Sequence, residues 1–193
     1  MQQYEHSVAL DLEKCTGCTT CARHCPTEAI RIRAGRAVIN AHRCIDCGVC
    51  IGVCPHKAKH ATFASLDAMD RFSYKIVLPA PSLYGQFGGL EDIDYIIDGL
   101  YALGFDDVYE VASAAELVSA YTRMYMATPG IKKPVISSAC PTVTRLISMR
   151  FPYLRDNIMP MLPPMEIAAK LAKRRAIKAH PALAPEQIGV CFI

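Results

Sequence analysis

The sequence predicts two consecutive domains: an α+β domain of the order βαββαβ, and then a partial α/β domain built on a parallel sheet. The first prediction comes from a cysteine array that occurs twice, with Cys44 repeating Cys15 after 29 residues. The second comes from strand and helix signals that alternate from Phe72 onward, which is typical of a sheet covered by helices. The expected boundaries are 1–62 for the first domain, 63–74 for a linker and 75–193 for the second domain.

Between the arrays, two short apolar and charged runs flank Ala34 and Gly35. This pattern predicts a β-hairpin over 29–33 and 36–39, closed by a glycine turn.

The second domain is predicted from apolar periodicity and from helix start and stop signals. Gly104 is expected to end a helix, Ser113 to cap one with Glu116 three residues later, and Pro141 and Pro164 to open two more. The predicted strands are 75–78, 107–111, 135–137 and 188–193, and the predicted helices are 93–103, 113–127, a helix from 142 onward and 165–178. Because the last strand reaches the last residue, we expect a domain fragment whose apolar faces are incompletely covered.

Composition indicates a folded protein, with 52% apolar residues among 193 and a formal charge of +3. The charges are spread along the chain, so nothing in the pattern favours nucleic acid or a membrane as partner. There is no signal peptide pattern and no run of eighteen apolar residues, and the sequence therefore predicts a cytoplasmic protein.

Eight of the ten cysteines fall in the two arrays, each of the form C-x2-C-x2-C-x3-C-P. This spacing is that of ferredoxin-like domains with two 4Fe-4S clusters, in which the last cysteine of each array binds the other cluster. We therefore predict electron transfer through two such clusters, with Gly17 and Gly48 permitting tight ligand loops. The predicted ligands are Cys15, Cys18, Cys21 and Cys54 for one cluster, and Cys44, Cys47, Cys50 and Cys25 for the other. Zinc bound by the C-x2-C pairs is the alternative.

Three further segments carry a family resemblance: KIVLPAPSLYGQF at 75–87, ISSACPTVTRLISMRFP at 136–152 and PPMEIAAKLAK at 163–173. With the dicluster arrays before them, they resemble the large subunit of iron-only (FeFe) hydrogenases, and most of all its sensory or regulatory branch. The resemblance implies an anaerobic setting, and as partners a redox protein or the remaining hydrogenase-like or signalling domains.

In that family a catalytic H-cluster is held by cysteines from three motifs, of which this sequence contains the first. Cys140 occupies the position of its cube ligand, and Ala139 stands where the family has a cysteine that relays protons. Cys191 lies ahead of the expected second motif and is interpreted as a buried apolar residue. We therefore expect no H-cluster and no catalytic residue in this chain alone.

Three functions remain open at this point. The first is an electron-transfer module that serves an adjoining hydrogenase-like or sensory site. The second is a redox or hydrogen sensor that changes its affinity for a partner. The third is an active hydrogenase completed by another chain.

Overall fold

The computed structural model describes residues 6–89 and 92–193, and the chain divides into two compact units. One unit comprises Met1–Ala64 together with Ile136–Met159, and the other comprises Ser65–Val135 together with Pro160–Ile193. Segment 136–159 therefore lies with the cysteine arrays in space, although it follows the second unit's first strand in sequence.

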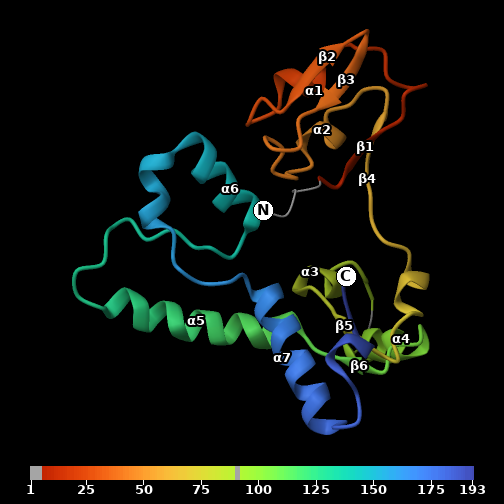
Figure 1. Cartoon of the computed structure of the whole chain (residues 1–193), viewed down its shortest axis with the longest axis vertical. Helices are drawn as coiled ribbons and strands as arrows, with labels where there is room; N and C mark the ends of the chain where they lie inside the picture. Colours follow the sequence, from red (N-terminus) through yellow and green to blue (C-terminus); the bar gives the residue numbers. More distant parts are fainter. Residues whose placement is uncertain (1–5, 90–91) are drawn as a thin grey trace. The chain divides into compact units, whose positions relative to one another are not determined.

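In the first unit the elements run β1 (Val8–Leu10), α1 (Thr20–Arg23), β2 (Ile30–Arg33), β3 (Arg36–Ile39), α2 (Val49–Gly52) and β4 (Lys59–Ala61). The strands pair as two separate antiparallel sheets, β1 with β4 and β2 with β3 (Figure 1). The predicted hairpin is confirmed, and Ala34 and Gly35 both take positive φ in its turn, at 46° and 72°. Two central residues of positive φ match the right-handed twist of the flanking strands.

The core of this unit is small and includes cysteines. Cys15, Cys21 and Cys50 are buried among apolar residues from both halves of the repeat, namely Val8, Ile30, Ala37 and Ala58. Small domains bury a smaller fraction of their surface than large ones, and many gain stability from disulfides or bound metals.

The same unit contains α6 (Pro141–Arg150), followed by the 3₁₀ helix η2 (Pro152–Asn157). Pro141 occupies the first turn of α6, as predicted, where the missing N–H costs no hydrogen bond. The predicted strand 135–137 is reduced to a single parallel bridge between Ile136 and Ile158.

The second unit is built on a parallel sheet of order β6-β5-β7, which confirms the predicted sheet type. The central strand β5 (Tyr74–Leu78) lies between β6 (Asp107–Val108) and β7 (Ile188–Phe192). Ile76 and Val77 are fully buried on opposite faces of β5, because helices cover both sides of a sheet of this kind.

One face of the sheet packs against α5 (Val111–Ala127) and α7 (Pro164–Ala179), and the alanines of α7 allow close approach. The other face packs against Leu100 of α4 (Asp94–Ala102), Phe105 and Met69 of η1 (Leu66–Met69). The remaining elements are α3 (Pro81–Tyr84) and η3 (Pro185–Gln187). In the described part of the chain, no helix has both the length and the apolarity needed to cross a membrane.

The largest differences between predicted and observed helix and strand ends in this unit lie where β6 ends and α5 begins. Strand β6 ends at Val108 instead of residue 111, because Val111 already begins α5. Ser113 is therefore inside the first turn, where its N–H donates to the Glu110 carbonyl, and the predicted Ser113 cap is wrong. Gly104 does follow the end of α4 at φ 91°, as its residue type predicts.

Helix α5 leaves part of its surface uncovered in this chain. Leu117, Tyr121 and Met124 are 56%, 42% and 72% exposed, and their spacing places them on one side of the helix. Such an apolar stripe is typical of a helix that packs against a further element.

Gly189 offers a test of the packing between β7 and the segment before β5. A Cβ at this position would collide with the Phe72 ring and lie 2.9 Å from Cε of Met69. We expect Gly189→Ala to destabilise the second unit by about 1–3 kcal/mol, seen as faster hydrogen exchange of β5 amides.

The matched control is Gly99→Ala within α4, where an added Cβ meets nothing within 4 Å. That change is expected to stabilise the helix by roughly 0.5–1 kcal/mol. Equal exchange rates in the two variants would contradict the packing described for Gly189.

Candidate iron-sulfur sites

The first cavity in the cysteine-rich unit is lined by Cys15, Cys18, Cys21 and Cys54. Three of them come from the first array and the fourth comes from the second. Cys21 lies on α1 and is buried, whereas Cys18 is exposed at the rim. The space there that protein atoms do not fill is about 320 Å³, and this figure includes the opening to solvent.

The second cavity has the complementary composition, with Cys44, Cys47 and Cys50 from the second array and Cys25 from the first. Cys50 is buried on α2 and Cys47 is exposed. Its unfilled space, which also includes the opening to solvent, is about 340 Å³ and so is close to that of the first cavity. The structure thus gathers the cysteines in the same two sets of four that the spacing predicts.

Positive-φ residues bend both ligand loops. They are Gly17 and Thr19 in the first array, and Asp46 and Gly48, which follow them by 29 residues, in the second. Each loop thus has two left-handed residues within three positions, and three cysteines of each array line one cavity. Gly17 and Gly48 are two of these positions, in agreement with the role predicted for them.

Backbone amides donate hydrogen bonds to Cys25 and Cys54, the two cysteines that each line the cavity of the other array. Ala29 N–H donates to Sγ of Cys25 over 3.2 Å, and Ala58 N–H donates to Sγ of Cys54 over 3.3 Å. Both alanines are 1% exposed, so these bonds are shielded from water. Hydrogen bonds of this kind stabilise negative charge on sulfur and raise the reduction potential of a bound cluster.

Burial controls the ionisation of the inner cysteines. It raises the pKa of the Cys21 thiol and raises that of Cys50 to about 11, while the nearby Lys59 ammonium opposes both shifts. By contrast, a hydrogen bond from the Thr20 backbone lowers the pKa of the exposed Cys18 thiol. The buried thiolates therefore need a positively charged partner, which iron supplies.

The arrangement fits a four-iron cube better than a single ion. Zinc holds four sulfurs at about 2.3 Å each, so they must converge on one point. Here the four cysteines of each set line a cavity.

Helix α6 contacts the second array directly. Arg145 donates to the Cys44 carbonyl over 2.9 Å, and the Thr142 hydroxyl donates to the Ile45 carbonyl over 3.0 Å. An ion pair of 3.3 Å joins Arg150 to Glu28. No sequence pattern predicts these contacts, because they join residues 97 to 122 positions apart.

Cys140 immediately precedes α6 and is exposed, in the same compact unit as both cavities. Cys191 belongs to the other unit, where it lies partly buried on β7, and burial raises the pKa of its thiol. The structure therefore does not bring Cys140 and Cys191 into one unit.

Lys59, which is not among the residues predicted from the sequence, lines the first cavity and is only 3% exposed. The sequence repeat distinguishes this position, because the equivalent residue in the first half, 29 positions earlier, is Ile30. A lysine in the place of a core isoleucine is unusual enough to mark the position.

Comparison with known proteins gives two family matches. Residues 73–193 match the model of the iron-only hydrogenase large subunit, C-terminal domain, and residues 7–55 match that of the 4Fe-4S dicluster domain. The first match covers well over half of the chain. The second covers both cysteine arrays, so the 4Fe-4S clusters predicted from the spacing are confirmed as cofactors of this domain type.

Individual relatives match each part. The NADP-reducing hydrogenase subunit HndD of Solidesulfovibrio fructosivorans is 23% identical over 86% of this chain, and a ferredoxin of Methanothermococcus thermolithotrophicus is 38% identical over 27% of it, covering 92% of that ferredoxin. A component of the ion-translocating oxidoreductase complex of Methanosarcina acetivorans is 43% identical over 23% of this chain. The chain spans 34% of HndD and 17% of the Methanosarcina protein.

The ligand loops can be tested at their glycines. A Cβ at Gly17 would lie 2.5 Å from the Gly35 carbonyl oxygen, whereas at Gly48, with nearly the same φ, it would meet nothing within 4 Å. Gly48→Ala should therefore cost about 1–2 kcal/mol from the left-handed backbone alone. Gly17→Ala should cost about 1–3 kcal/mol more. We expect a lower iron content per purified chain for Gly17→Ala than for Gly48→Ala, and equal contents would contradict this geometry.

Proposed function

The chain belongs to the iron-only hydrogenase large-subunit family and carries a 4Fe-4S dicluster domain ahead of its hydrogenase domain, and we propose that its two clusters relay single electrons between a redox partner and a hydrogenase-type centre. The observation that carries the proposal is the pair of cavities, each lined by four cysteines, three from one array and one from the other.

In this proposal Cys15, Cys18, Cys21 and Cys54 hold one cluster, and Cys44, Cys47, Cys50 and Cys25 hold the other. A 4Fe-4S cube supplies one-electron redox chemistry that no side chain offers. The protein excludes water from the buried ligands, directs amide N–H groups at Cys25 and Cys54, and ties the two halves together through the exchanged cysteines.

The exposed ligands define where electrons enter and leave. Cys18 and Cys47 are each the most open cysteine of their set, so they bring each cluster closest to the surface. A redox protein or another domain of a longer polypeptide docks at these edges in our proposal.

The contacts of α6 support a role for the second cluster as the one nearer the hydrogenase centre. Arg145 and Thr142 hold the start of α6 against the carbonyls of Cys44 and Ile45, and Cys140 precedes that helix directly. By its family resemblance, Cys140 is proposed as a cube ligand of an H-cluster. The other ligands of that centre would come from sequence outside this chain.

Ala139 bears on whether such a centre turns over hydrogen or senses it. A methyl group has no proton to exchange, so the relay expected at this position is lost. We therefore favour electron transfer to a sensory centre over rapid hydrogen production. Hydrogen evolution assays after maturation, with and without a complementing chain, test this: sustained turnover would contradict the sensory assignment, and restoration of turnover only by Ala139→Cys would support it.

The first experiment is an iron and acid-labile sulfide count on anaerobically purified protein, with EPR of the reduced form. We expect about eight irons per chain and the signals of two interacting cubes. Zinc in place of iron would overturn the electron-transfer proposal. Reduced protein that passes no electrons to a low-potential acceptor would also overturn it.

Paired cysteine variants test the exchange of ligands between arrays. If the fourth ligand crosses, Cys18→Ala with Cys54→Ser removes two ligands from one cluster and leaves about four irons. Cys18→Ala with Cys25→Ser then damages both clusters and leaves few irons. The two double variants change the same number of cysteines, so each is the control for the other. The reverse pattern of iron contents would show that each array holds its own fourth ligand.

A further inference from the structure

The two halves of the cysteine-rich unit differ at one buried position. Ala29 and Ile30 follow the last cysteine of the first array and line the second cavity. The equivalent residues of the second half, 29 positions later, are Ala58 and Lys59, and they line the first cavity. Ile30 and Lys59 are 2% and 3% exposed. A lysine thus occupies the buried site that the repeat fills with isoleucine in its other half.

Lys59 reaches no protein partner at its charged end. It lies on β4 opposite Leu10 of β1, and in the described part of the chain nothing accepts a hydrogen bond from its Nζ. Burying an unpaired ammonium is costly, and an isoleucine in the same place would avoid that cost. A negative group beside Nζ would offset that cost.

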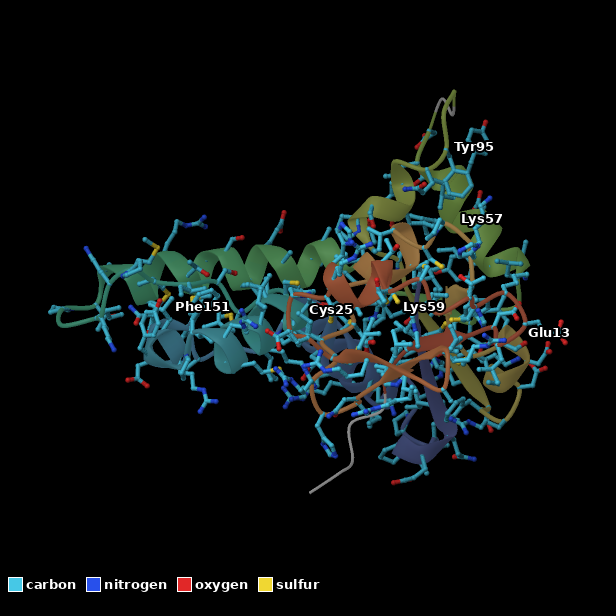
Figure 2. The ribbon with its side chains drawn as sticks, turned by 90° about the horizontal axis from the view of Figure 1, so that it is seen from above. Glu13, Cys25, Lys57, Lys59, Tyr95 and Phe151 are labelled. Carbon is cyan, nitrogen blue, oxygen red and sulfur yellow. The ribbon has the colours of Figure 1, made fainter. Side chains whose placement is uncertain are left out.

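Cysteine thiolates that hold a cluster would supply such a negative group. Lys59 shares the lining of the first cavity with Cys15, Cys18, Cys21 and Cys54. Its charge also acts on Cys50, the buried ligand of the second set, as well as on Cys21. Figure 2 labels Lys59 together with Lys57, its exposed neighbour two residues earlier.

We propose that Lys59 is a buried positive charge that raises the reduction potential of the cluster held by Cys15, Cys18, Cys21 and Cys54, and raises that of the other cluster by less. This inference rests on the cluster ligation proposed above. A cube held by four thiolates carries net negative charge and gains another on reduction, so a fixed cation in a low-dielectric site favours the reduced form. The effect is uneven because Lys59 lines only the first cavity.

The consequence is a built-in difference between two otherwise repeated clusters. An electron that enters the domain is drawn to the cluster beside Lys59, and the duplicated cysteine arrays by themselves give no such preference. Lys59 is a positioning and tuning residue in this proposal, since no covalent step passes through it.

The test is an EPR-monitored redox titration of the full chain, purified anaerobically, as wild type and as Lys59→Met, Lys59→Arg and Lys57→Met. For Lys59→Met we expect at least a tenfold shift in one cluster's reduction equilibrium toward the oxidised form, about 59 mV for one electron, and a smaller shift in the other. Lys59→Arg keeps the charge and should retain the wild-type potentials. Lys57→Met removes an equal charge from an exposed site, where solvent screens it, and should leave both potentials unchanged.

The iron count separates this inference from the proposed function. Fewer than about eight irons in the wild type would overturn the ligation itself. Full iron content with unchanged potentials in Lys59→Met, or equal shifts in Lys57→Met, would overturn only the role of Lys59. If Lys59→Met loses a cluster, retention by Lys59→Arg supports the charge as the cause, and loss in both variants contradicts it.

Discussion

The cysteine-rich unit depends on the exchange of one cysteine between its two halves. Cys25 lines the cavity of the second array and Cys54 that of the first, so neither cavity is complete without the other half. The strands themselves are three or four residues long and pair in two separate sheets. Because the apolar core is small, the shared cluster sites cross-link the two halves as disulfides do in other small domains. Metal binding is therefore coupled to folding.

Burial of these sites also raises the free-energy cost of placing a charge inside them. Neutral thiols are favoured at Cys21 and Cys50 until a cation is present, and the amides of Ala29 and Ala58 give partial compensation to the crossing sulfurs. Among the described residues that line the two cavities, Lys59 is the one full positive charge. Its buried position makes it more effective than any of the exposed lysines, whose fields are screened by water and salt.

The hydrogenase-family segment is divided in space. Its parallel sheet, with β5 between β6 and β7, forms the second unit, whereas the stretch with Cys140 and α6 is packed on the second cysteine array through Arg145 and Thr142. The stretch with Cys140, proposed above as part of an H-cluster site, therefore lies in the same unit as the two cysteine-lined cavities. This arrangement gives a structural reason for a dicluster domain and a hydrogenase domain to occur together in one chain.

The sequence by itself determined the features that depend on local chemistry. Cysteine spacing predicted the clusters and their two sets of four, Ala34 and Gly35 predicted a hairpin turn, and the alternation after Phe72 predicted a parallel sheet. A local pattern gave a wrong prediction at Ser113. Its capping pattern predicts a helix start there, but the helix begins two residues earlier, at Val111. Only the tertiary structure decided that residues 136–159 join the first unit and that Lys59 is buried beside one cavity. Both outcomes depend on contacts between residues far apart in the chain, and the free energy of such contacts is set by burial, which no short sequence pattern records.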